Sequence, residues 1–176
     1  MSTVRGSLIA EVYDTDIYTI GGNASTTFLN INEKYNIINN AWSTKLNLLG
    51  FRYQIYSSIN SSNIFVISGM EYDDSNIISN KNEYYDRLTD NWITKAVIIT
   101  PRSRLTSLLV NGIIFYMNGT ITIINEPSDI NEAYMITTDT WIVRDNTALY
   151  KLYDVSNIIN NVMYNTGGSN GIGVIY

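Results

Sequence analysis

Residues 82–92 read NEYYDRLTDNW, and this stretch decides the fold because the chain contains three versions of it. The other two are NEKYNIINNAW at residues 32–42 and NEAYMITTDTW at residues 131–141. Each version reads Asn-Glu-x-Tyr, then six residues and a tryptophan, and the closing residues Trp42, Trp92 and Trp141 lie 50 and 49 residues apart. A repeat of this length predicts an array in which each version belongs to one supersecondary unit.

Two more markers recur with the same phase. A glycine closes an apolar stretch before each version and once more after the last, and a basic residue opens each unit. The glycines are Gly22, Gly69, Gly119 and Gly168, and the basic residues are Arg5, Arg52, Arg102 and Lys151, with steps of 47, 50 and 49 in both series. Three markers with one phase predict four units of common architecture.

This set of markers resembles the kelch repeat of β-propeller proteins, in which Gly-Gly follows the second strand and a Tyr and a Trp come after it. By composition the chain most resembles bacterial and phage kelch-like proteins. It departs from the pattern at Ser68 and Asn118, which replace the first glycine, and at Lys151, which replaces arginine. The resemblance implies an all-β, kelch-like β-propeller with three complete four-stranded blades and a partial fourth, in a single domain over residues 1–176. The expected blades span about 5–46, 52–97, 102–143 and 151–176.

Alternation and turn residues place the strands within each blade, and Asn111-Gly112 between apolar runs is a strong hairpin signal. We expect inner strands at 7–13, 53–59, 104–110 and 151–159, and second strands at 16–21, 63–68, 113–118 and 162–166. We expect third strands at 27–37, 79–88, 130–136 and 171–176, and outer strands at 41–46, 91–97 and 140–143.

The markers have structural roles in a propeller, because both faces of a blade are apolar and must pack against neighbours. We expect the tyrosines and all three tryptophans to fill the gaps between blades and to be buried. We expect the glycines to turn the chain sharply. The arginines are expected at the mouth of a central channel, where each planar guanidinium can bond to carbonyl groups of the adjacent blade.

Composition excludes several classes of function. The chain has no cysteine and no histidine, so disulfides, thiolate chemistry and imidazole bases are absent. A net charge of −5 argues against nucleic acid as a partner. The first residues lack a charged leader with an apolar core, and no apolar run could span a bilayer. We therefore expect no signal peptide, no membrane insertion, and a cytoplasmic or virion-associated location.

The acidic loop at Glu71, Asp73 and Asp74 is the one place where carboxylates gather. A carboxylate pair can perform acid–base chemistry on a glycoside or bind calcium weakly. No third ligand or glycine-centred pattern accompanies these residues, so we interpret the loop as solvated. We expect no cofactor, no metal and no enzymatic activity, and a carbohydrate-processing propeller is the alternative.

A non-enzymatic scaffold that presents loops on one propeller face is the function that the resemblance favours. The loops between second and third strands and between blades lie on this face, and binding residues concentrate on loops held by a rigid scaffold. The expected partner is a protein or a surface glycan, and the chain could be a component of a phage or tailocin particle. The candidate binding residues are Phe51, Arg52, Tyr72, Asp73, Asp74, Arg102 and Tyr150.

How the ring closes is left open by the sequence. Propellers have roughly 4–8 blades, and closure protects the edges of their sheets. One chain could close a small four-bladed ring, several chains could share a larger ring, or an open arc could dock on another assembly. We therefore keep a monomer, a homo-oligomer and a docked arc as alternatives.

Overall fold

Four-stranded antiparallel sheets dominate the computed structural model, which describes residues 1, 3–73, 75–124, 126–148, 150–159 and 162–170. No helix occurs among these residues. Three sheets have the strand orders β1-β2-β5-β6, β8-β9-β12-β13 and β14-β15-β16-β17, and a fourth consists of β18 and β19. The predicted all-β fold, with three complete blades and a partial fourth, is confirmed.

The strands of the blades have the following bounds. Blade 1 contains β1 (Ile9–Tyr13), β2 (Asp16–Ile20), β5 (Asn32–Asn36) and β6 (Ala41–Lys45). Blade 2 contains β8 (Tyr56–Ile59), β9 (Asn63–Ile67), β12 (Asn82–Asp86) and β13 (Asn91–Lys95). Blade 3 contains β14 (Thr106–Val110), β15 (Ile113–Met117), β16 (Asn131–Met135) and β17 (Thr140–Arg144). Blade 4 contains β18 (Val155–Ile159) and β19 (Val162–Thr166), and its expected third strand at 171–176 lies outside the described residues.

Five shorter strands lie in the connections between these elements. The strands β3 (Asn23–Ala24) and β4 (Thr27–Phe28) form a hairpin between the second and third strands of blade 1. In blade 2, β10 (Met70–Asp73) and β11 (Ser75–Ile78) form a longer hairpin in the same place, and β7 (Arg52–Tyr53) pairs with β10. The sequence predicted loops at residues 23–26 and 70–78, and it predicted one strand at residues 27–37, which form two.

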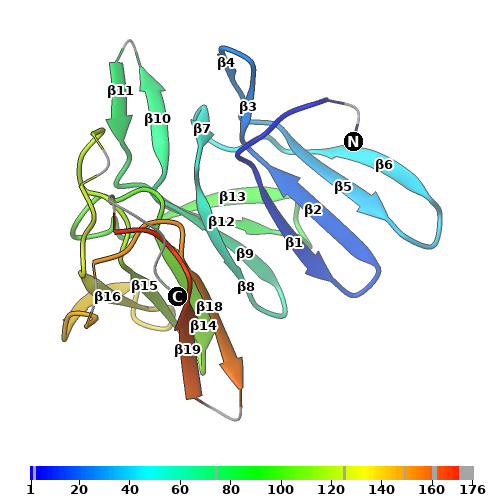
Figure 1. The fold of residues 1–176 in the computed structure, drawn as a ribbon. Coiled ribbons are helices and arrows are strands. Elements are labelled where there is room, and N and C mark those ends of the chain that lie inside the picture. Colours follow the sequence, from blue (N-terminus) through cyan, green and yellow to red (C-terminus); the bar gives the residue numbers. More distant parts are fainter. Residues whose placement is uncertain (2, 74, 125, 149, 160–161, 171–176) are drawn as a thin grey trace.

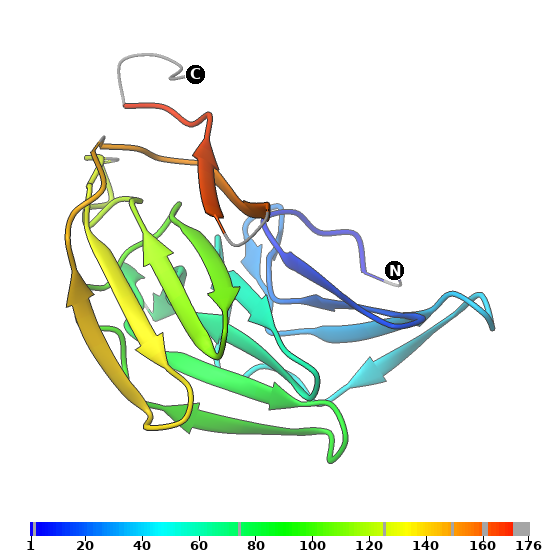
Figure 2. The same cartoon turned by 90° about the horizontal axis from the view of Figure 1, so that it is seen from below.

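The blades are arranged around their inner strands, as Figures 1 and 2 show. The inner strands β1, β8, β14 and β18 contact one another in chain order. They line a hollow of about 560 Å³ whose walls come from all four blades. The hollow is the central channel that the propeller architecture predicts.

The inner strands begin two to four residues later than predicted because the chain kinks just before each of them. Ser7, Gln54, Arg104 and Tyr153 have φ angles of 52°, 49°, 55° and 59°. Positive φ is unusual for residues other than glycine. Contacts between blades compensate for it, since the Gln54 N–H donates to the Ser7 carbonyl and the Tyr153 N–H to the Arg104 carbonyl, both at 3.0 Å.

The apolar core lies between blades and repeats from one interface to the next. Trp92 is 5% exposed and donates its Nε1–H to the Leu46 carbonyl of blade 1 at 2.8 Å. Trp141 makes the same bond to the Ala96 carbonyl of blade 2 at 2.7 Å. Trp42 differs, because it is 38% exposed and no blade precedes blade 1 in the described part of the chain. The prediction of three buried tryptophans is therefore wrong for Trp42, and Trp141 is only partly buried.

The arginines fasten the strands of a blade to one another. Arg102 donates to the carbonyls of Asn118 and Ile130 at 2.9 and 2.7 Å and forms an ion pair with Glu132 at 2.9 Å. Arg5 pairs in the same way with Glu33, and Arg52 with Glu83. The prediction that the arginines bond to carbonyls of the adjacent blade is wrong. Across the sheet, Arg5 and Arg102 donate only to carbonyls of their own blade.

The glycine positions, by contrast, connect each blade to the next. The Gly22 N–H donates to the Arg52 carbonyl at 2.9 Å, and the Gly119 N–H donates to the Lys151 carbonyl at 2.9 Å. Ser68, which replaces the first glycine in blade 2, has a φ of 58° and shares a hydroxyl hydrogen bond with the Arg102 backbone. The departure from Gly-Gly thus adds a polar contact between blades.

Candidate binding face

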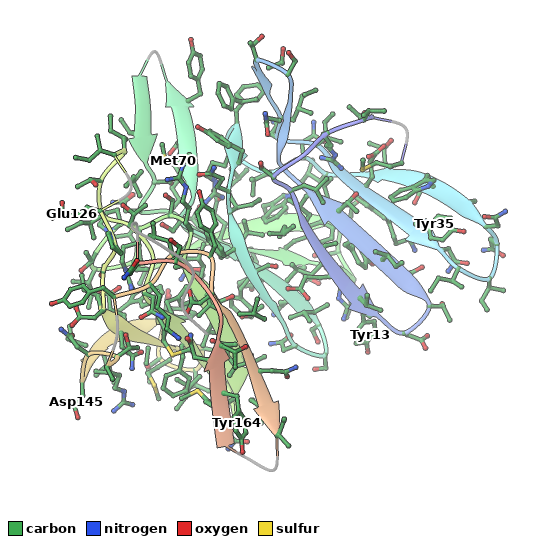
Figure 3. All side chains as sticks on the ribbon, in the orientation of Figure 1. Tyr13, Tyr35, Met70, Glu126, Asp145 and Tyr164 are labelled. Atoms are coloured by element: carbon green, nitrogen blue, oxygen red, sulfur yellow. The ribbon has the colours of Figure 1, made fainter. Side chains whose placement is uncertain are left out.

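The hairpins β3–β4 and β10–β11 and the strand β7 project from the same side of the blades, at the top of Figure 1. This side carries the connections between second and third strands, as the sequence predicted. The turns between third and outer strands lie at the opposite end, because each third strand runs away from this side. We call the side with the hairpins the hairpin face; Figure 3 labels Met70 at the base of β10.

An aromatic cluster joins the two hairpins. The rings of Phe28 and Tyr72 are stacked with centroids 4.9 Å apart, and Phe28 lies 4.7 Å from the ring of Tyr53. Phe51 completes a pocket of about 380 Å³, which we call the aromatic pocket. It is lined by Thr26, Thr27, Phe28, Phe51 and Tyr72.

Two of the predicted anchors thus come together. Phe51 and Tyr72 are 52% and 50% exposed, and the ring of Tyr72 is stacked on that of Phe28. The sequence did not single out Phe28, which it placed near the start of the predicted third strand at residues 27–37. Tyr150 is exposed but lies in the connection to blade 4, so it does not line this pocket.

The two arginines predicted for this face are not on the surface. Arg52 and Arg102 are both 0% exposed, and their guanidinium groups bond to glutamates and carbonyls inside their blades. Burial lowers the pKa of both arginines, while Glu83 and Glu132 act in the opposite direction. They support the loops of the hairpin face, and we exclude them from the contact surface.

The acidic loop divides between the interior and the hairpin tip. Glu71 is 9% exposed and forms an ion pair with Lys81. Asp73 belongs to β10, but its side chain and the whole of Asp74 lie outside the described residues. No group of three or more acidic residues that could hold a metal ion occurs in the part of the chain that the structure describes.

Two titratable groups in the wall of the central hollow, Glu11 and Tyr56, have a pKa that burial raises. Glu11 lines the hollow and accepts a hydrogen bond from the Ser57 hydroxyl at 2.6 Å. Burial raises the pKa of Glu11, and the bond from Ser57 offsets part of that shift. Asp154 is a second carboxylate in the wall of the hollow, and it accepts hydrogen bonds from the amides of Asn118 and Asn165.

Comparison with known proteins agrees with this architecture. The kelch motif matches residues 10–45, which cover most of blade 1. The chain is 28% identical over 149 residues to the kelch repeat protein C2 of camelpox virus (strain CMS), and 28% identical over 141 residues to that of vaccinia virus (strain Western Reserve). The chain is a kelch-repeat protein. These matches cover 73% and 80% of this kelch-repeat chain.

The chain spans only about a quarter of the curated relatives that it matches, since the alignments cover 28% and 27% of their lengths. A solved structure, that of YjhT, has the same fold with a TM-score of 0.81 at 14% sequence identity. That match covers 93% of this chain and 59% of YjhT. The named viral relatives lend no support to a bacterial or phage origin, which stays a prediction.

The described residues include no helix with the length and apolar character needed to cross a membrane.

Proposed function

We infer that this kelch-repeat chain is a non-enzymatic binding scaffold whose hairpin face holds an apolar or aromatic anchor of a protein partner. The aromatic pocket carries this inference. Kelch-repeat propellers commonly mediate protein interactions, and the pocket supplies a concave, largely apolar site on exposed hairpins.

The pocket is well suited to an anchor residue because two of its rings, those of Phe28 and Tyr72, are stacked on each other before a partner arrives. Phe28 is fixed between Tyr53 and Tyr72, so binding costs little of the side-chain entropy that flexible residues lose. Aromatic residues in desolvated pockets provide most of the free energy at many interfaces. A partner that covers Phe51 and Tyr72 also removes two half-exposed rings from water.

A glycan is the second partner class, because Thr26 and Thr27 place hydroxyl groups beside the stacked rings of the pocket. A carbohydrate-processing activity has less support, since Glu71 is committed to Lys81. A cytoplasmic or virion-associated location, and a role in a phage or tailocin particle, are proposals that rest on the sequence alone.

The test is selection of peptides from a random library on the 176-residue chain, with a glycan array in parallel. Peptides with aromatic or large apolar anchors should be enriched and should lose at least about tenfold in affinity on Phe51→Ser or Tyr72→Ser. Leu88→Ser is the matched control, because Leu88 is 82% exposed in the turn between β12 and β13 at the opposite end of blade 2.

Enriched peptides that bind Phe51→Ser as well as the unsubstituted chain would contradict the pocket as the site. If glycans bind and lose affinity on Phe51→Ser and Tyr72→Ser, the partner is a glycan and not a protein.

A further inference from the structure

The wall of the central hollow is acidic and aliphatic. It contains the carboxylates of Glu11 from blade 1 and Asp154 from blade 4, together with the hydroxyl groups of Ser57, Ser107 and Ser156 and several aliphatic side chains. No lysine or arginine lines the hollow among the residues that the structure describes. The wall therefore offers negative charge, hydrogen-bond acceptors and apolar surface in one space of about 560 Å³.

Asp154 departs from the repeat at this place. Leu8, Ile55 and Leu105 hold the same position in blades 1, 2 and 3, with the steps of 47, 50 and 49 residues that the other markers have. Ile55 and Leu105 are 4% and 1% exposed, and Asp154 is 6% exposed. Three blades thus use an apolar residue here, so the repeat itself requires no carboxylate. A carboxylate at a buried position costs free energy of desolvation unless other groups compensate for it.

Hydrogen bonds within the chain compensate for only one of the two oxygens of Asp154. Its Oδ2 accepts bonds from the amides of Asn118 and Asn165, which joins blade 3 to blade 4. Its Oδ1 is buried and accepts no hydrogen bond among the described residues. Buried polar atoms of folded proteins nearly always have a partner, which can be a water molecule or an ion. The Oδ1 atom therefore marks a place for a hydrogen-bond donor.

Glu11 is the second carboxylate of the hollow. It accepts a hydrogen bond from the Ser57 hydroxyl at 2.6 Å. None of the ion pairs among the described residues includes Glu11 or Asp154. Burial raises the pKa of Glu11, and a cation next to a carboxylate acts in the opposite direction because it favours the ionised form. Both carboxylates of the hollow are thus suited to a positively charged ligand.

We propose that the central hollow binds a linear aliphatic diamine as a dication, with one ammonium group on Asp154 and the other on Glu11. Each ammonium group has three N–H donors, enough for a carboxylate oxygen and for hydroxyl groups of the wall. The methylene chain of the ligand packs on aliphatic residues such as Ile55 and Leu105. This site is separate from the aromatic pocket, so the diamine is a ligand in addition to the protein partner.

The composition of the wall favours a diamine over other small ligands. An anion finds no basic side chain among the described lining residues. Calcium takes six to eight oxygen ligands, and no group of three or more acidic residues that could hold a metal occurs in the described ranges. A neutral polyol can bond to the hydroxyl groups but leaves both carboxylates without a counter-charge. A dication with an apolar body uses the carboxylates, the hydroxyl groups and the aliphatic surface together.

Calorimetric titration of the 176-residue chain at constant ionic strength tests the proposal. The probe is diaminobutane with terminal amines, and the comparison ligands are butylamine, which has one amine, and butanediol, which has none. We expect saturable binding of the diamine and at least about tenfold weaker binding of butylamine, since one charge-assisted contact is lost. Equal binding of the three ligands, or no saturable binding at millimolar diamine, would overturn the proposal.

Variants of the chain identify the carboxylates involved. Asp154→Asn and Glu11→Gln keep the size of each side chain, and each should weaken diamine binding at least about tenfold. Glu126→Gln is the matched control, because it removes the same charge from an exposed residue, labelled in Figure 3, that does not line the hollow. Its affinity for the diamine should stay unchanged, and so should that of Phe51→Ser, which tests the aromatic pocket alone.

Thermal melting without ligand shows whether each variant is folded, and Glu11→Gln carries the test if Asp154→Asn does not fold. An equal loss in Glu126→Gln would show that the diamine responds only to the negative charge of the chain, and this would overturn the site. Undiminished binding in Glu11→Gln would equally contradict a ligand that bridges the two carboxylates.

Discussion

The clearest quantitative prediction compares two identical substitutions, Trp92→Ala and Trp42→Ala. Trp92 is 5% exposed between blades 1 and 2, where its indole also donates to the Leu46 carbonyl at 2.8 Å. Its truncation should lower the free energy of unfolding by about 3–5 kcal/mol. Trp42 is 38% exposed and packs on Tyr35 alone among the described aromatic rings, so its truncation should cost no more than about 1 kcal/mol.

Urea unfolding followed by far-UV circular dichroism measures both losses without relying on tryptophan emission. In a chain of this size, 1 kcal/mol corresponds to about 2–4 °C in the melting temperature. Trp92→Phe separates the contribution of ring packing from that of the indole hydrogen bond. It keeps most of the ring and removes the bond, which is worth about 1 kcal/mol. Equal losses in Trp92→Ala and Trp42→Ala would refute the view that packing between blades, and not the Tyr–Trp pair within a blade, stabilises the array.

Three further predictions concern the remaining markers. Arg102→Met leaves a buried glutamate unpaired and should lower the free energy of unfolding in urea by about 3–5 kcal/mol. Lys151→Met removes a buried cation that forms no ion pair among the described residues, so stability should stay equal or rise; a larger loss in the second variant would contradict this. Gly119→Ala places a Cβ 2.6 Å from a backbone oxygen, while Gly112→Ala meets nothing within 4 Å, so thermal melting should show the larger loss in the first although both have positive φ. Burial alone would raise the pKa of Asp90, but bonds from a tyrosine hydroxyl and a backbone N–H lower it. The contribution of the ionised Asp90 carboxylate to stability is therefore lost as pH falls through its folded-state pKa. Between about pH 5 and about pH 3, the Asp90→Asn variant should lose less stability than the original chain.

The period of the repeat predicted most of the fold, because three marker series with one phase can be satisfied only by repeated sheets. Blade number, strand order and most hairpin turns followed from it. The phase of a marker does not tell which neighbour it contacts, however. Arg102 was expected to reach the adjacent blade, but its side chain bonds within blade 3, while the backbone carbonyl of Arg102 is the group that Ser68 of blade 2 contacts.

The candidate site was only partly predictable, for two physical reasons. Phe51 and Tyr72 lie 21 residues apart, and the pairing of β7 with β10 that brings them together has no local signal. Phe28 comes from another blade altogether and reaches them through the β3–β4 hairpin. Pockets of this kind form from irregular connections, whose conformation the repeat does not determine.

The repeated residues make two kinds of contact, one within a blade and one between neighbouring blades. The contacts between glutamate and arginine are complete inside each of blades 1, 2 and 3, so they are satisfied whatever lies next to the blade. The contacts of tryptophan need the neighbouring blade, and they are unmade at both limits of the described array. At one limit the Trp42 side chain is 38% exposed. At the other limit the Asp145 carbonyl accepts a bond from the Asn131 amide, but no tryptophan of the described residues donates to it. Because interfaces supply much of the stability of repeat proteins, a tryptophan that contacts the neighbouring blade contributes more to stability than one that does not, as the comparison of Trp92→Ala with Trp42→Ala tests.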